Sequence, residues 1–313
     1  MQLKKLNPIY IYHHRAAFFP ILRRIGRALK RPVDAFFKYC GEQSMMRRHP
    51  LIKIQVQTCS WCNLRCGFCP NITEHANRTQ ELMDRSVYDK IIADLKQIDF
   101  SGMFIPYLMN ESMLDPRLVE LVSYARRELP KAYILIDTNC TLLTKEKLKT
   151  LIDAGVDDIR LNCYSEDMYE RMMALVATLD NREPVRYIVP YYKERERSAY
   201  YNRGGNIDVH NRVDQIPDLK MRCLKPFNQM FVNFRGDALV CCSDWQYRIV
   251  MGNVQKESLM NIWNNARYAL YRNLLCKGER RQLDLCNKCN YIENGLTPDL
   301  MPQTWKRSAP DRS

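Results

Sequence analysis

Short apolar segments alternate with amphipathic segments from residue 51 to about residue 205, and this alternation limits the possible folds more than any other feature of the sequence. The short segments predict strands and the amphipathic ones predict helices. Because parallel neighbours need a crossover helix, the order indicates an α/β fold with a parallel sheet, open or partly closed into a barrel. The expected strands are Leu51–Gln57, Met103–Leu108, Ala132–Asp137, Asp158–Cys163 and Val185–Pro190, and the expected helices are Asp84–Gln97, Pro116–Glu128, Lys145–Ala154 and Ser165–Leu179.

The 13 cysteines among the 313 residues are unevenly spread along the chain. Neither a secretory signal nor an apolar run of about 18 residues is present, so a cytoplasmic protein is expected. In a reducing compartment, clustered cysteines are typical of metal or redox sites rather than of disulfides. Ligand sites in parallel α/β folds lie at the carboxyl ends of the strands, and the first cysteine cluster follows the first expected strand.

That cluster contains Cys62, Cys66 and Cys69, with three and then two residues between them, preceded by Cys59. A 4Fe–4S cluster normally takes four thiolates. Three thiolates leave one iron open, and an open iron suits the amino and carboxylate groups of methionine. The alternatives are a Cys59–Cys62 dithiol pair and a zinc site made by all four cysteines.

The stretch from Cys62 to Cys69 resembles the signature loop of the radical S-adenosylmethionine (SAM) enzymes, including the aromatic residue before the last cysteine. The resemblance implies a partial (β/α)6 TIM-like barrel and leaves Cys59 as a spare. It also implies SAM-binding roles for four residues that follow successive strands or lie in the loop. These are Phe68 against the adenine, Glu111 in place of the family's Gly-Gly-Glu turn, Asn139 in Thr-Asn-Cys, and Asn162 at the end of the fourth strand.

A second set of cysteines follows the barrel. Twelve residues separate Cys223 from Gly236, four residues separate Gly236 from Cys241, and a Cys-x2-Cys pair follows later. The pattern resembles the short "twitch" form of the SPASM auxiliary iron–sulfur domain, with a structural zinc site as the alternative. The ligands that the resemblance implies are Cys223, Cys241, Cys286 and Cys289, whereas Cys40, Cys140, Cys163, Cys242 and Cys276 are expected to be bystanders.

The first 50 residues hold 11 Lys and Arg against two acidic residues, so about +9 of the +13 formal charge lies there. Apolar residues at helical spacing predict an amphipathic helix that packs on the main domain or meets an anionic partner or membrane surface. Four regions are expected: the basic extension (1–50), the barrel (51–210), an auxiliary domain (211–293) and a tail (294–313). The auxiliary domain is expected to contain a β-hairpin (Met230–Asn233 and Ala238–Cys241) and a helix (Ser258–Leu275).

Taken together, the resemblance implies a radical SAM oxidoreductase with two 4Fe–4S clusters. The expected reaction is the two-electron oxidation of a carbinol in a sugar or cyclitol, with the auxiliary cluster accepting an electron and Arg203 contacting substrate or SAM. The alternative is a radical modification of a ribosomal peptide or a sugar, namely a crosslink, a thioether or an epimerisation. Expected partners are a small-molecule or peptide substrate and a reductant such as flavodoxin or ferredoxin, and no nucleic acid is expected.

Overall fold

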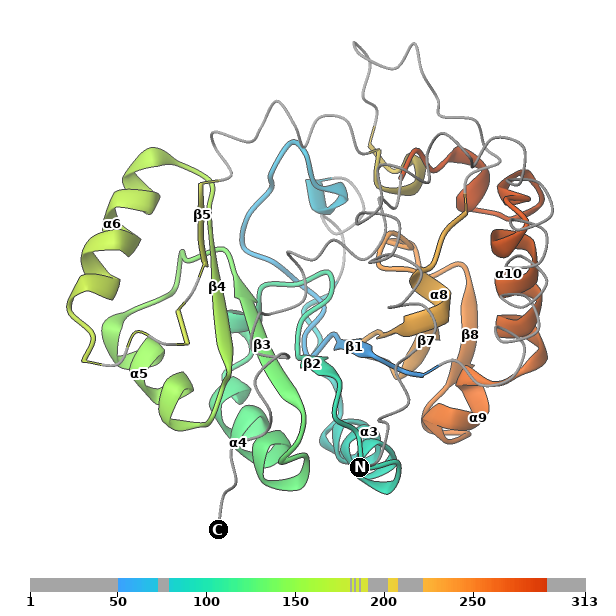
Figure 1. Ribbon diagram of the computed structural model, residues 1–313. Helices are drawn as coiled ribbons and strands as arrows, with labels where there is room; N and C mark the ends of the chain where they lie inside the picture. Colours follow the sequence, from blue (N-terminus) through green and yellow to red (C-terminus); the bar gives the residue numbers. More distant parts are fainter. Residues whose placement is uncertain are drawn as a thin grey trace, which may run out of the picture. The chain divides into compact units, whose positions relative to one another are not determined.

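Eight strands form one sheet in the computed structural model, in the order β5-β4-β3-β2-β1-β6-β7-β8 (Figure 1). The structure describes residues 50–72, 79–180, 182, 184, 185, 187–190, 202–207 and 222–291. The strands are β1 Lys53–Val56, β2 Met103–Ile105, β3 Tyr133–Thr138, β4 Asp158–Cys163, β5 Tyr187–Pro190, β6 Gln229–Val232, β7 Asp237–Leu239 and β8 Val250–Asn253. Pairing is parallel from β5 through to β6 and antiparallel between β6, β7 and β8. The expected parallel α/β fold is confirmed.

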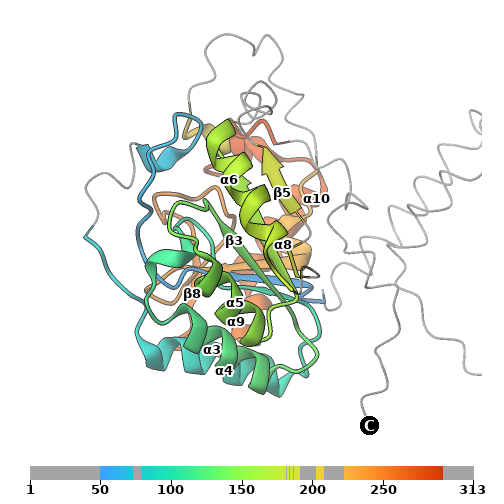
Figure 2. The ribbon, with the colours of Figure 1, turned by 90° about the vertical axis from the view of Figure 1, so that its left-hand side faces the viewer.

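Four helices connect the first five strands, as expected from the sequence. They are α3 Arg85–Gln97, α4 Leu118–Glu128, α5 Lys145–Asp153 and α6 Glu166–Ala177. The Tyr88 ring of α3 lies 6.2 Å from the Phe104 ring of β2, so Phe104 faces this helix. Its register partners Ile54 and Ile134 are fully buried. Figure 1 shows α3 to α6 along the outer side of the curved sheet, and Figure 2 shows the same sheet with α6 and β5 nearest the viewer.

The opposite face of the sheet carries polar groups, because successive side chains of a strand point to opposite faces. The residue after Ile54 is Gln55, and the alternate positions of β3 and β4 include Asp137, Arg160 and Asn162. Asp137 is the register partner of Arg160, so these side chains share a face. The concave side of the barrel is therefore polar toward the carboxyl ends of its strands.

The expected hairpin forms, but it is part of the main sheet. Strands β6 and β7 turn at Gly236, whose φ of 82° is in the left-handed region that favours glycine. Strand β6 also pairs in parallel with β1, from Lys53 opposite Gln229 to Val56 opposite Val232. Strand β1 is therefore central, flanked by β2 and β6.

The single helix expected at Ser258–Leu275 is wrong, since two helices occupy this segment. Helix α9 is Leu259–Trp263 and helix α10 is Ala266–Cys276. The side chain of Asn265 accepts a hydrogen bond of 2.9 Å from the Tyr268 N–H and caps the N-terminus of α10. Because an N-cap residue has a non-helical backbone, a new helix starts there. A short helix, α8 Lys225–Asn228, leads into β6.

The described residues belong to one compact unit, His49–Ile292. Residues 1–49 of the basic extension and the whole tail of residues 294–313 lie outside the described residues. Among the helices that are described, none has the length and apolarity to span a bilayer.

Candidate active site

Cys62, Cys66 and Cys69 lie in the loop that leaves the carboxyl end of β1. The Cys69 N–H donates to the Cys66 carbonyl at 2.9 Å, which closes a turn between the last two cysteines. All three side chains are partly buried. Burial raises the pKa of the Cys62 thiol to about 12 and also raises the pKa of Cys69. The free thiols of Cys62 and Cys69 are therefore protonated at neutral pH, and binding of a metal must release these protons.

Backbone and side-chain amides surround the sulfur atoms of this loop. The Leu64 N–H donates to Cys62 Sγ at 3.5 Å, and the Asn71 N–H donates to Cys69. The Asn139 amide donates to the same Cys62 sulfur at 3.6 Å. Hydrogen bonds to cysteine sulfurs stabilise thiolates and tune bound iron–sulfur clusters. The donor set therefore fits a cluster held by these thiols.

The loop is fixed to the ends of the two neighbouring strands along the chain. The Glu111 N–H, after β2, donates to the Trp61 carbonyl at 3.1 Å. The Asn139 amide, after β3, donates to Asn63 Oδ1 at 2.9 Å. Glu111 and Asn139, which the sequence named as SAM-binding candidates, are thus brought to the cysteine loop.

The Glu111 carboxylate is buried and makes three hydrogen bonds within the chain. Its Oε1 accepts from the Thr138 hydroxyl at 2.6 Å and from the Met113 N–H at 3.1 Å, and its Oε2 accepts from the Asn139 N–H at 2.7 Å. Burial raises the pKa of Glu111, and the hydrogen bonds oppose that rise. The carboxylate therefore also fixes the end of β2 to the end of β3.

Asn162 lies on the polar face, where its Nδ2 donates to Asp137 Oδ1 at 3.3 Å. Its Oδ1 is buried, and no partner for it lies within the described part of the chain. The Arg160 guanidinium lies 3.7 Å from the same Asp137 oxygen. A buried acceptor without a partner is costly, and a ligand hydroxyl or amine would satisfy it.

Phe68 faces the end of β4. Its ring centroid lies 5.3 Å from that of Tyr164, which follows β4, with 40° between the planes. Two aromatic rings at the rim of the polar face suit a flat heterocycle such as adenine.

Arg203 begins the one-turn helix η3 (Arg203–Gly205). Its positive charge lies close enough to Cys69 to lower the pKa of that thiol, although burial raises the pKa by more. The segment is held on the second cysteine set: the Asn202 N–H donates to Asn290 Oδ1 at 2.8 Å, and the Asn202 amide donates to the Lys288 carbonyl at 2.6 Å. Arg203 is therefore placed between the two cysteine sets.

The four cysteines expected to bind an auxiliary cluster line one cavity. They are Cys223, Cys241, Cys286 and Cys289. Cys242 and Cys276 are not among the residues that line it. Because a closed cluster needs four thiolates around one space, the donor set fits an auxiliary 4Fe–4S cluster.

Amide donors also accompany these sulfurs. The Ser243 N–H donates to Cys241 Sγ, and the Tyr291 N–H donates to Cys289 Sγ, both at 3.4 Å. Burial raises the pKa of Cys286 to about 12. In both cysteine sets, the backbone N–H two residues after a cysteine donates to its sulfur, as at Cys62 and Cys69. Such donors stabilise thiolate ligands.

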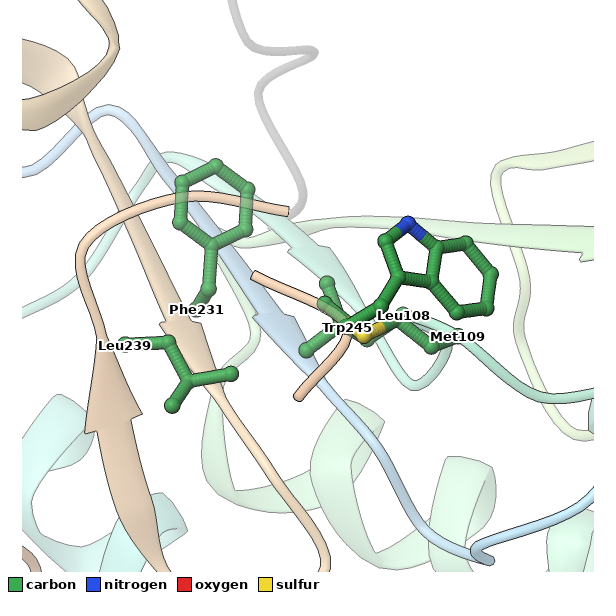
Figure 3. Packing of buried hydrophobic residues seen from close by; sticks show 5 residues of the cluster. All are labelled: Leu108, Met109, Phe231, Leu239 and Trp245. Carbon is green, nitrogen blue, oxygen red and sulfur yellow. The ribbon is translucent and has the colours of Figure 1, made fainter. Parts of the chain in front are cut away.

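A hydrophobic cluster lies against both cysteine-bearing segments. It consists of Leu108, Met109, Phe231, Leu239 and Trp245, and Figure 3 shows Trp245 beside Leu108 and Met109 with Phe231 and Leu239 on β6 and β7. Cys69 packs against this cluster, and so does Cys242, the neighbour of Cys241 in the chain. The cluster therefore joins the first cysteine loop to the segment that carries Cys241.

Comparison with known families assigns both parts of the chain. Residues 56–186 match the radical SAM superfamily. Residues 56–186 therefore form a radical SAM domain. Residues 223–290 match SPASM, an iron–sulfur cluster-binding domain, and this match begins at Cys223 and includes Cys289. This radical SAM enzyme therefore uses SAM and a 4Fe–4S cluster, and its C-terminal domain binds further iron–sulfur.

The radical SAM enzyme is similar to the S-adenosyl-L-methionine-dependent 2-deoxy-scyllo-inosamine dehydrogenase of Niallia circulans, with 28% identity over 76% of this chain and 92% of that protein. Its structure resembles the crystal structure of BtrN in complex with AdoMet and 2-DOIA, with a TM-score of 0.68 and 26% identity over 78% of this chain and 94% of that chain. A cofactor-modifying protein of Pyrococcus furiosus, for tungsten-containing aldehyde ferredoxin oxidoreductase, is 33% identical over 33% of this chain and 28% of that protein.

Sequence reasoning missed several side chains at these sites. Asp137, Arg160 and Tyr164 could have been found as polar or aromatic residues at alternate positions near the ends of β3 and β4. Lys225 and Arg280 line the auxiliary cavity, and only the tertiary structure brings them there.

Proposed function

We propose that this chain is a radical SAM dehydrogenase that oxidises a carbinol of a sugar or cyclitol to a ketone. One observation carries the proposal: three thiols lie at the carboxyl end of β1, while four other thiols line a separate cavity. This dehydrogenation removes a hydrogen atom from the carbinol carbon, and the substrate radical then releases the hydroxyl proton and a second electron. The reaction therefore needs a radical source and an electron acceptor. The similarity to a cyclitol dehydrogenase over most of its length supports this reaction.

In the proposal, Cys62, Cys66 and Cys69 hold the SAM-binding cluster, and Cys223, Cys241, Cys286 and Cys289 hold the auxiliary one. When bound, these groups supply a 5′-deoxyadenosyl radical and an acceptor for the second electron. Phe68, with Tyr164, receives the adenine. Glu111 and Asn139 orient the methionine end of SAM, since both also fix the cysteine loop.

The polar face holds the remaining ligand groups. Asn162 Oδ1 is buried without a partner among the described residues, and it accepts a hydrogen bond from a hydroxyl or amine of SAM. Asp137 and Arg160 supply an acceptor and a donor for the hydroxyls of the substrate. Arg203, placed between the two cysteine sets, contacts the substrate and orients the reacting carbinol.

External partners complete the proposal. A flavodoxin or ferredoxin supplies the electron that starts each turnover. The basic extension, which lies outside the described residues, meets an anionic partner or membrane surface through its Lys and Arg residues. The cytoplasmic location stays a prediction of the sequence.

The test begins with protein that is reconstituted without oxygen. It should carry about eight irons if both 4Fe–4S clusters form. A Cys62→Ala/Cys66→Ala/Cys69→Ala variant should keep about four irons and lose SAM cleavage, whereas Cys276→Ala should behave like the wild type. If the triple variant still forms 5′-deoxyadenosine, the assignment of the radical source is wrong.

The reaction itself is tested with aminocyclitols and sugars deuterated at single carbinol carbons. Deuterium should appear in 5′-deoxyadenosine, with one ketone formed for each SAM consumed. Deuterium transfer without a ketone would contradict the dehydrogenase and favour an epimerisation. Turnover only with a peptide would favour the modification of ribosomal peptides.

A further inference from the structure

Two buried cations line the cavity that contains Cys223, Cys241, Cys286 and Cys289. They are Lys225, with 7% of its surface exposed, and Arg280, with 2% exposed. Among the described residues that line this cavity, none is Asp or Glu. Buried lysine and arginine are uncommon unless an anion or another partner group compensates the charge.

Lys225 lies at the start of α8, two residues after Cys223. Its Nζ donates to Cys242 Sγ at 3.4 Å and lies 3.9 Å from the centroid of the Tyr291 ring. Both contacts hold the ammonium group beside the segments that carry Cys241 and Cys289. The charge is therefore fixed near the cavity.

Arg280 bonds only to backbone carbonyls in the described structure. Its Nη1 donates to the carbonyls of Tyr291 at 2.8 Å and Cys289 at 3.4 Å, and its Nη2 donates to the Arg222 carbonyl at 2.8 Å. Its Nε is buried, with no partner in the part of the chain that is described. Carbonyl oxygens carry only partial charges, so the guanidinium keeps most of its positive charge at the cavity.

The buried carboxylate of Asp244 also lies in this region, close enough to Cys286 to contribute to its raised pKa. Its two oxygens accept the N–H groups of Arg248 at 3.1 Å and Ile249 at 2.7 Å. These amides offset its charge, and the carboxylate does not line the cavity. The two cations therefore dominate the charge at the cavity wall.

We propose that Lys225 and Arg280 raise the reduction potential of the auxiliary cluster, so that the cluster accepts the electron of the substrate radical. Reduction adds one negative charge to a cluster that four thiolates already make anionic. Nearby cations stabilise the reduced form more than the oxidised one, and a poorly solvated site screens this interaction weakly. The inference rests on the proposed function, because that function assigns the cluster to the cavity.

The experiment uses the full chain with Cys62→Ala/Cys66→Ala/Cys69→Ala, so that only the auxiliary cluster contributes to the spectra. Redox titrations followed by electron paramagnetic resonance give its midpoint potential. Lys225→Met should lower the ratio of reduced to oxidised cluster at a fixed potential about tenfold, which is about 59 mV for one electron. Lys225→Arg, which keeps the charge, should stay near the parent.

Lys96→Met is the matched control, because it removes the same charge from a lysine side chain that is 63% exposed on α3. Solvent screens that charge, so the potential should not change. An unchanged potential in Lys225→Met, or an equal shift in Lys96→Met, would overturn the proposal.

Loading of the cluster is measured in each variant through its iron content. If Lys225→Met does not bind iron, Lys225→Gln removes the charge and keeps a donor for Cys242. If neither variant loads while Lys225→Arg does, Lys225 serves assembly and the proposal is overturned. If the Cys62→Ala/Cys66→Ala/Cys69→Ala protein with native Lys225 binds no cluster, the auxiliary site of the proposed function is contradicted. If a cluster binds but its potential does not shift in Lys225→Met, only the effect of Lys225 on the potential is contradicted.

Discussion

Asn139, just after β3, has its side-chain nitrogen 3.6 Å from the sulfur of Cys62, which follows β1. Strand β2 lies between these two strands in the sheet, so the contact crosses the carboxyl edge of the barrel. The same amide donates to Asn63. One side chain thus supports a proposed ligand and the loop that carries it.

Replacement of Asn139 by alanine should weaken the SAM-binding cluster, because it removes a donor to a thiolate and an anchor of the loop. Loss of such an outer-shell partner typically reduces metal affinity or activity by about 10- to 100-fold. The measurements are the iron content and the rate of 5′-deoxyadenosine formation. Asn261→Ala, at an exposed position of α9, is the control. Equal rates in the two variants would contradict this role.

Arg280→Ala should destabilise the auxiliary site, since Arg280 joins the backbone before Cys223 to the backbone around Cys289. Loss of hydrogen bonds from a buried charged group should lower the free energy of unfolding by about 3 kcal/mol. Iron content should also fall, and thermal unfolding and iron analysis measure the two effects. Arg281→Ala at the exposed neighbouring position should change neither, and a similar loss there would refute the interpretation.

Gly204→Ala should displace the segment that carries Arg203. Gly204 has a φ of 71°, and a Cβ atom there would lie 2.7 Å from Leu285 Cδ1. Strain in the left-handed region and the clash should together cost about 1 to 3 kcal/mol. Gly67→Ala is the control, because its Cβ would meet no atom within 4 Å. Urea unfolding of both variants gives the comparison, and an undiminished stability of Gly204→Ala would contradict the prediction.

Glu111 should make the metal-free protein less stable as the pH rises. Burial raises the pKa of this carboxyl group, so between the unfolded and the folded pKa the native state binds more protons than the unfolded state. Stability due to this group is then full below the unfolded pKa and falls as the pH rises through the folded pKa.

Glu111→Gln lacks this titration. The difference in unfolding free energy between variant and wild type should therefore move in favour of the variant as the pH increases from about 4 to 7. Urea unfolding of metal-free protein at a series of pH values checks this. A difference that does not vary with pH would show that Glu111 keeps an ordinary pKa.

The local pattern predicted the elements well where the signals were strong. The alternation of apolar segments predicted β1 to β5 and α3 to α6, and the cysteine spacing indicated a three-thiolate loop after the first strand. The break between α9 and α10 was missed, because Asn264 and Asn265 interrupt an apolar pattern that by itself favours one helix.

Local periodicity was enough to predict the parallel α/β class, and close spacing was enough to single out the loop of Cys62, Cys66 and Cys69. The choice of the four later cysteines came from the resemblance to the auxiliary iron–sulfur domain. The pairing of β6 with β1, and the position of Lys225 and Arg280 at the cavity of the later cysteines, became visible in the three-dimensional structure alone. These relations join residues far apart in the chain. Such contacts depend on how the whole sheet pairs and packs, which no short stretch of sequence encodes.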